Sequence, residues 1–488
     1  MATSVTGVGS ISSAGLGSGL DVASIVNQLM AVEKRPLTLL QSQAASLNTR
    51  LSNVGKMQGY FSTLRDTSNA LTGTTLWGGT IATSADTAAV KVSTSTGAVA
   101  GNYAVNVSRL AVGQTVTGTA LASSAATLSE GTLTIELGRY GSGDPAVGFT
   151  AKSGSSAISI AIGSGETSLA GIRDKINAAG AGVSATLVTD ASGSRLSLRS
   201  RETGAENAFR IGVTESINDG NAATGLSALA YDATAAGSPM GRSTSAANAD
   251  LTINGIAVNS ASNTLSNVVD GLTLTLLKTT TADVDVGVTE DTASVKAAVT
   301  DFISAFNTLA AFIRTQTAYN TDNKSGGALQ GDSATLSLQS QLRAVLNEGS
   351  SASSTWSRLS DIGIGIKSDG TLQTNETKLG NALGNLPELK KLLSADGGSS
   401  GESGFVRRFK RLADAALGSD GVFESRSAGI RSSVTRNGKS QEAMQERLTQ
   451  TEARLRAQYS ALDTKMATLT NLSSYMTQQI TQMNRTSG

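Results

Sequence analysis

Apolar side chains recur every seven residues along the C-terminal part of this chain. The repeat is formed by Leu448, Leu455, Leu462, Leu469, Met476 and Met483. A second set, four residues further on in each repeat, consists of Glu452, Tyr459, Met466, Ser473 and Ile480. Alternating steps of four and three residues are typical of the seam of a coiled coil. The pattern therefore predicts a long helix that needs a protein partner, because a single helix is only marginally stable in water.

The N-terminal part of the chain carries a helical pattern of the same kind. Asp21 is a suitable N-cap for a helix that begins at Val22, and Pro36 indicates the first turn of a second helix. The second helix should be about 35 residues long and end at Gly73. Its apolar stripe includes Leu37, Leu40, Leu47, Leu51 and Val54. We expect the two terminal regions to pair with each other, and association between copies of either helix is the alternative.

Between Trp77 and Asp291 the apolar positions change from helical spacing to alternation, which is typical of half-buried strands. Strands are expected near Val90 and at residues 103–107, 133–137, 158–162, 183–188, 195–199, 209–213, 251–258, 272–276 and 284–288. One short helix interrupts them, with Leu169, Ile172 and Ile176 on one face. This middle region is expected to form two β modules.

Helical spacing returns after the β region. A small hairpin is predicted at residues 364–372, turning at Asp369-Gly370. Further helices are expected over residues 376–393 and 405–417. The final helix is expected to start near Ser440, after a break between helices.

The predicted fold class is α+β and multidomain: the terminal helices form a coiled-coil or helical-bundle leg, and predominantly β domains are inserted between them. Four domains are expected. They are a terminal coiled-coil region (1–40 with 452–488, including a flexible start at 1–20), a helical bundle domain (41–77 with 291–451), a β domain (78–112 with 246–290) and an inserted outer β domain (113–245).

Composition removes most routes to catalysis. The 488 residues include no cysteine and no histidine, so disulfides, thiol nucleophiles and the commonest general base are absent. The net charge of +1 gives no long-range attraction for nucleic acid or an anionic membrane. No apolar run approaches the roughly 20 residues that span a bilayer. We therefore expect no enzyme activity, no cofactor, no metal, no nucleic-acid partner and no membrane insertion.

Three short motifs could suggest chemistry, but each lacks the required context. Residues 397–401 match the G-x-S-x-G nucleophile pattern without a histidine partner. Residues 438–440 resemble the end of a phosphate-binding loop, yet Ser433 stands where its first glycine should be. The basic residues within 407–411 are typical of a solvated helix face. The three motifs therefore predict a flexible loop, a break between helices and a solvated surface.

Characteristic segments occur at both ends of the chain and in its middle. They are residues 15–21, 25–26, 36–37, 103–107, 251–277, 454–459 and 473–476. Through these segments the chain resembles, from end to end, the flagellar hook-associated protein 2 family, the filament caps of bacterial flagella. Residues 172–204 are also similar to a repeat that is shared with flagellins.

The resemblance implies a homo-oligomeric ring, commonly a pentamer, at the tip of the flagellar filament. Such a ring prevents flagellin loss and promotes flagellin insertion and filament elongation. Flagellin, the hook-filament junction protein and a flagellar export chaperone are the implied partners. The implied location is extracellular, after export without a cleaved signal peptide; residues 1–20 carry no charge and lack the basic start of such a peptide. The alternatives are another flagellar axial or junction protein, and an adhesin that binds a host surface through its β domains.

Overall fold

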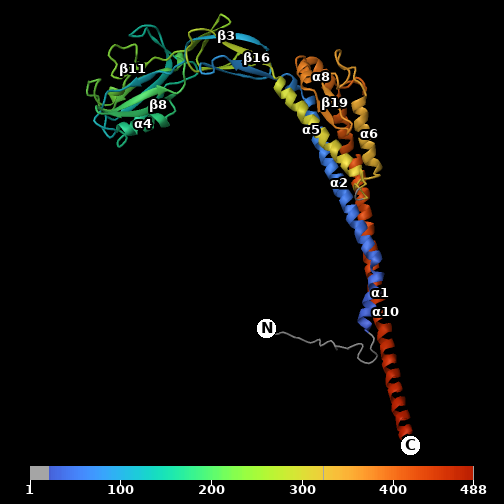
Figure 1. Ribbon diagram of the computed structural model, residues 1–488. Coiled ribbons are helices and arrows are strands. Elements are labelled where there is room, and N and C mark those ends of the chain that lie inside the picture. Colours follow the sequence, from blue (N-terminus) through green and yellow to red (C-terminus); the bar gives the residue numbers. More distant parts are fainter. Residues whose placement is uncertain (1–20, 322–323, 487–488) are drawn as a thin grey trace. The chain divides into compact units, whose positions relative to one another are not determined.

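The computed structural model describes residues 21–321 and 324–486 (Figure 1). The flexible start predicted for residues 1–20 lies outside the described residues. The chain divides into a helical unit, formed by Met1–Gly73 with Thr292–Gly488, and a β unit, formed by Thr74–Asp291. A β-rich segment is thus inserted between terminal helices, which confirms the predicted α+β class. The finer division into four domains stays a prediction.

The helical unit contains eight helices in its described residues. They are α1 (Val22–Glu33), α2 (Arg35–Thr72), α5 (Thr292–Thr317), α6 (Ser333–Asn347), α7 (Glu376–Leu383), α8 (Leu386–Ser394), α9 (Phe405–Leu417) and α10 (Val422–Thr486). Two small hairpins accompany them: β17 (Tyr319–Asn320) with β18 (Ser325–Gly326), and β19 (Ile364–Ile366) with β20 (Leu372–Thr374). The second hairpin confirms the predicted turn, in which Gly370 has a positive φ of 84°.

Local rules explain how the N-terminal helices begin and end. The Asp21 carboxylate accepts a hydrogen bond from the Ser24 backbone N–H (2.9 Å), so it caps α1 as predicted. Pro36 lies in the first turn of α2, where its missing N–H leaves no helical bond unmade. Gly73 follows the last residue of α2 and adopts an extended conformation, which ends the helix.

The core of the helical unit lies where α2, α5, α9 and α10 pack together. Phe409 of α9 contacts Phe302 and Phe306 of α5, with ring centroids 5.4 and 5.6 Å apart. Phe61 of α2 meets Phe423 of α10 edge to face at 5.2 Å. Tilted aromatic pairs of this kind add to the stability from buried area. The Phe409 pairs join α9 to α5, and the Phe61–Phe423 pair fixes the first turn of α10 against α2.

The start of α10 corrects the prediction that the final helix begins near Ser440. The helix begins at Val422, and Ser440 lies inside it, with its hydroxyl donating to the Arg436 carbonyl oxygen (3.1 Å). A glycine such as Gly438 costs a helix only about 1 kcal/mol relative to alanine. Packing against α2 outweighs that cost, so the expected break between helices does not occur.

The inner β module is a two-sheet sandwich within the β unit, preceded by the short helix α3 (Thr74–Trp77). The larger sheet has the order β1 (Thr80–Ser84), β16 (Val284–Glu290), β3 (Gly101–Arg109), β12 (Ala249–Ile253) and β13 (Ile256–Ser260). The smaller sheet has the order β14 (Thr264–Val269), β15 (Leu272–Leu276) and β2 (Val90–Thr94). Alternate side chains such as Val105, Val107 and Leu251 form the core between the sheets.

The outer β module has its own core and is inserted between β3 and β12. One sheet contains β10 (Ala208–Glu215), β5 (Gly131–Tyr140), β6 (Phe149–Ala151) and β7 (Ile158–Ile162). The other has the order β11 (Gly241–Thr244), β4 (Thr115–Thr117), β9 (Gly193–Ser200) and β8 (Val183–Asp190). Helix α4 (Leu169–Ala178) contributes Leu169, Ile172 and Ile176 to this core, as its sequence predicts.

Two predicted segments are interrupted by turns. The strand expected at 251–258 is a hairpin, because Asn254 and Gly255 have positive φ values (49° and 79°) and turn the chain back on itself. The helical stretch expected at 376–393 is divided where Gly384 ends α7 and Asn385 caps α8. In both places two residues that favour a turn interrupt a longer apolar pattern, and the pattern alone predicted one continuous element.

Candidate assembly interface

The upper seam of the helical unit is the contact between α2 and the first half of α10. Val54 is buried there, and Leu37, Leu40, Leu47 and Leu51 are half-buried. Figure 1 shows the two helices side by side over this length. The predicted stripe of α2 therefore lies toward α10 rather than toward open solvent.

A polar layer interrupts this seam at about its middle. Asn437 is 9% exposed, and its side-chain amide donates to the Gln43 side-chain oxygen (3.4 Å). The Gln441 amide donates to the Asn437 side-chain oxygen (2.6 Å) and to the Leu40 backbone oxygen (3.5 Å). A buried polar residue in a coiled-coil seam favours one register over the alternatives. Because polar residues occupy seam positions here, the apolar repeat does not extend into this half of α10, and the sequence pattern did not reveal it.

The lower seam is the contact between α1 and the middle of α10. Leu448 forms a buried cluster with Val22, Val26 and Met30 of α1. Four partly buried side chains pack against this cluster: Leu37, Met444, Leu455 and Tyr459. The chain's own helix α1 is thus the described partner for the first part of the predicted heptad repeat.

The rest of the repeat faces solvent in the part of the chain that the structure describes. Between 38% and 67% of each of these side chains is exposed: Leu462, Met466, Leu469, Met476, Ile480 and Met483. Leu472 and Tyr475 are exposed beside them and lie outside the strict seven-residue repeat, so the sequence pattern missed them. These eight residues are called the tail stripe below.

Apart from Leu462, the tail stripe lies in a segment of α10 that carries no charge. No Asp, Glu, Lys or Arg occurs between Lys465 and Arg485. Nearer the N-terminus of the same helix, Glu452 and Arg456 form an ion pair one turn apart (2.7 Å). Large exposed apolar patches mark protein interaction sites more often than free surface. The stripe is suited to bind another apolar helix by side-chain packing.

The basic cluster of α9 is engaged within the helical unit. The Arg408 guanidinium is buried and donates to the backbone oxygens of Ser403, Glu348 and Gly349 (3.0–3.1 Å). Burial lowers the pKa of Arg408, and Glu348 opposes that shift. Arg411 pairs with Asp396 at 2.5 Å. The cluster therefore ties loops together, and the prediction of a solvated face is wrong for Arg408.

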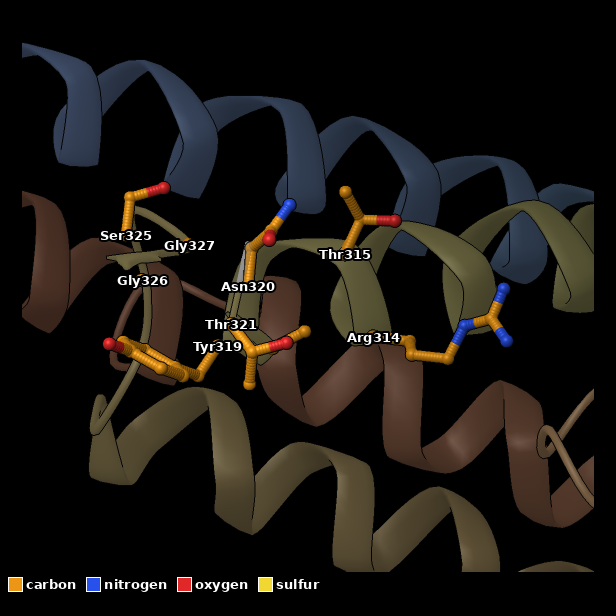
Figure 2. Close-up of a pocket in the computed structure, with 9 residues that line it drawn as sticks. Arg314, Thr315, Tyr319, Asn320, Thr321, Ser325, Gly326 and Gly327 are labelled. Carbon is orange, nitrogen blue, oxygen red and sulfur yellow. The ribbon is translucent and has the colours of Figure 1, made fainter. Parts of the chain in front are cut away.

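Other candidate sites show no converging chemistry. A cavity of about 550 Å³ lies beside the β17–β18 hairpin, and Figure 2 shows its Arg314 and Tyr319 side chains pointing in opposite directions. Residues 397–401 form a loop, as predicted. Among the described residues there is no group of three or more acidic side chains that could hold a metal ion. Within the same residues no helix is long and apolar enough to cross a bilayer.

The fold combines paired terminal helices, inserted β modules and an exposed apolar helix end. These features define the class of assembly proteins that act by binding other subunits. Residues 18–114 match the model of the flagellar hook-associated protein 2 N-terminus, and residues 246–471 match that of its C-terminus. Residues 147–202 match the flagellin hook IN motif. The chain belongs to the flagellar hook-associated protein 2 family.

Relatives and one solved structure agree with this assignment. Flagellar hook-associated protein 2 of Escherichia coli (strain K12) is 34% identical, over 96% of this chain and 98% of the relative. The B-type protein of Pseudomonas aeruginosa is 30% identical, over 98% of both chains. The crystal structure of the flagellar cap protein FliD D1-D2-D3 domains from Escherichia coli has a TM-score of 0.59 at 32% identity, covering 78% of this chain and 99% of that one.

These findings establish the chain as a flagellar cap protein, and they confirm the resemblance drawn from its terminal motifs. The alternatives of another axial or junction protein and of a host-surface adhesin are not favoured by the matches. The matched crystal structure from Escherichia coli is that of a flagellar cap protein. The assignment of individual coiled-coil residues stays a prediction, although the structure shows which of them are covered and which are exposed.

Proposed function

We propose that the chain caps the filament as a homo-oligomeric ring, with five copies as in the pentamer that the resemblance implies. The ring retains flagellin and promotes its insertion beneath the cap. The observation that carries this proposal is the tail stripe: eight apolar side chains stay exposed, and seven of them lie in the uncharged segment between Lys465 and Arg485. Leaving so much apolar surface in water is costly, at roughly 25 cal/mol per Å². Its burial against protein neighbours would drive assembly.

The tail stripe would be covered in the assembled ring by terminal helical segments. The terminal coiled-coil region of residues 1–40 with 452–488 belongs to this proposal. Its support is the arrangement of α1, which packs on α10 directly before the stripe begins. Residues 1–20, which precede Val22, lie outside the described residues. Their lack of charge matches the lack of charge in the tail stripe.

The resemblance also implies partners other than the chain itself, and the tail stripe is the surface that would bind them. Before assembly, a flagellar export chaperone would shield the tail stripe and keep it from associating too early. At the filament tip, the stripe and the leg would contact flagellin and the hook-filament junction protein. The chain would reach this extracellular position through the flagellar export route without a cleaved signal peptide.

The test is a triple variant of the tail stripe, Leu469→Ser, Met476→Ser and Ile480→Ser. A matched control changes three exposed polar residues of the same helix segment, Thr470→Ser, Thr477→Ser and Gln478→Ser. Native mass spectrometry should show loss of the oligomer only in the first variant. Cells that carry this variant should release flagellin into the medium and grow short filaments. An intact oligomer and normal filaments with the first variant would refute the proposal.

A truncation provides an independent measurement. Removing residues 462–488 leaves Leu448, Leu455 and the α1 contact in place. The truncated protein should therefore unfold at the same denaturant concentration as the full chain, yet fail to assemble. Normal filament growth with this truncation would contradict the role assigned to the tail stripe.

A further inference from the structure

Two chain connections join the inner and outer β modules, and they run side by side. Val112 and Ala247 pair as an isolated antiparallel bridge, with N–O distances of 2.9 and 3.1 Å. Two adjacent connections of this kind leave one axis about which the modules could turn. To hold the two modules in one orientation, another part of the outer module must also contact the inner module.

The turn between β9 and β10 supplies such a contact from the outer module. The Thr203 hydroxyl donates to the backbone oxygen of Ala261 in the inner module (2.8 Å). The Ala205 backbone N–H donates to the Asn248 side-chain oxygen (2.7 Å). The Gly204 N–H donates to the Val112 backbone oxygen (3.2 Å). Three successive residues of one turn thus bind three separate segments around the junction.

Gly204 is the residue that permits this close approach. It is buried and has a φ of 105°, a conformation that other residues rarely adopt. A Cβ atom at this position would lie 2.7 Å from the Ala261 Cβ and 2.8 Å from the Ala261 backbone oxygen. Any larger residue would therefore push the turn away from the inner module as well as strain its backbone.

On the inner side, the contact is held by a connected polar network. The Asn248 amide donates to the Asn259 side-chain oxygen (2.6 Å), and the Asn259 amide donates to Asp250 (2.5 Å). Arg109 pairs with Asp250 at 2.7 Å and donates to the Asn248 backbone oxygen (3.0 Å). Each side chain of this network is hydrogen-bonded to another one. The network therefore orients the Asn248 side chain independently of its contact with the turn.

We propose that Gly204 and Asn248 are positioning residues that lock the outer β module onto the inner one, so that the two modules move as a single body. The lock acts through the turn at 203–205 and contributes to neither module core. It is separate from the tail stripe, and it does not depend on the proposed mode of assembly.

The lock is tested in the full chain by distance measurement between spin labels. The chain has no native cysteine, so Lys91→Cys in β2 and Ala191→Cys in the β8–β9 turn carry the only labels, both at exposed positions. The labelled parent should give one narrow distance distribution. Gly204→Ala and Asn248→Ala should each broaden it roughly twofold or more, because the modules then sample several orientations.

Gly212→Ala is the matched control in the same module. A Cβ there meets nothing closer than 3.8 Å, and the distribution should stay narrow. Hydrogen exchange in β5 and β9 should be unchanged in Asn248→Ala, which separates loss of orientation from loss of folding. If Gly204→Ala disturbs folding of the outer module, Asn248→Ala alone decides. A distribution as narrow as that of the parent in Asn248→Ala would overturn the lock.

Discussion

The two halves of helix α10 differ in their surroundings, although the heptad repeat runs from one into the other. From Phe423 to Tyr459, the apolar face is covered by α2 and α1 of the same chain. From Leu462 to Met483, the side chains of the repeat are exposed in the described structure. The difference teaches that a heptad repeat predicts that its apolar face will pack against another helix. The repeat does not predict whether that helix belongs to the same chain or to another one. The covered half stabilises the monomer, and the exposed half is suited to drive assembly.

The largest expected contrast is between one aromatic residue that packs on the covered half of α10 and one aromatic residue in its exposed half. Phe61→Ala removes the ring that packs on Phe423 and should lower the free energy of unfolding by about 3–5 kcal/mol. Tyr475→Ala in the tail stripe should change it by less than about 0.5 kcal/mol. Urea unfolding followed by circular dichroism measures both. Equal losses would erase the distinction between the halves.

Asparagine provides the next comparison. Asn437→Ala removes the centre of the polar layer and should cost about 1 kcal/mol through its lost hydrogen bonds. The exposed Asn471 of the tail is the matched control, and Asn471→Ala should leave stability within about 0.5 kcal/mol of the parent. Thermal melting of the two variants in parallel is the measurement. A neutral Asn437→Ala would mean that the layer contributes nothing to the seam.

Glycine substitution should act in the stabilising direction in the covered half. Gly429 is exposed within α10, and a Cβ added there would meet no atom within 4 Å, so Gly429→Ala should add about 0.5–1 kcal/mol. Ser474→Gly in the tail should lower local helix content without shifting global unfolding, because the tail has no described core contacts to lose. Circular dichroism during urea unfolding measures both variants. A shift of global unfolding by Ser474→Gly would show that the tail takes part in the monomer fold.

The smallest expected effect is a dependence on pH that arises at Glu388, in the covered part of the helical unit. Lys391 first, and then Ser353 and the Ser354 N–H, hold the pKa of Glu388 at about 2, below its ordinary value of 4.5. A lowered pKa stabilises the fold above pH 4.5, and this contribution is lost as the pH falls from 4.5 toward 2.

Glu388→Gln should therefore show a weaker loss of stability between pH 5 and pH 3 than the parent. Glu442→Gln, which changes an exposed glutamate of α10, is the control and should behave like the parent. The tail between Lys465 and Arg485 has no carboxylate, so its helix content should not change over this range. Stability curves at the two pH values provide the readout, and identical curves for Glu388→Gln and the parent would contradict the assignment.

Local signals in the sequence predicted the elements whose boundaries depend on neighbouring residues. Asp21 caps α1, Gly73 ends α2, and Asp369-Gly370 turns a hairpin, because caps and turns are set by a few adjacent side chains. The short strand β4 (Thr115–Thr117) was missed because it is defined by pairing with distant strands rather than by its own pattern. Leu472 and Tyr475 were missed because they lie beside the repeat.

The sequence by itself determined that both terminal regions contain amphipathic helices, that β modules lie between them, and that a long apolar stripe on α10 requires protein contacts. Periodicity is a property of the chain alone, so it can be seen without coordinates. Only the tertiary structure decided that α10 begins at Val422, that α1 covers Leu448, and that the stripe stays exposed beyond Tyr459. Those outcomes depend on how far a partner helix extends along the stripe, which is a matter of packing between segments remote in sequence.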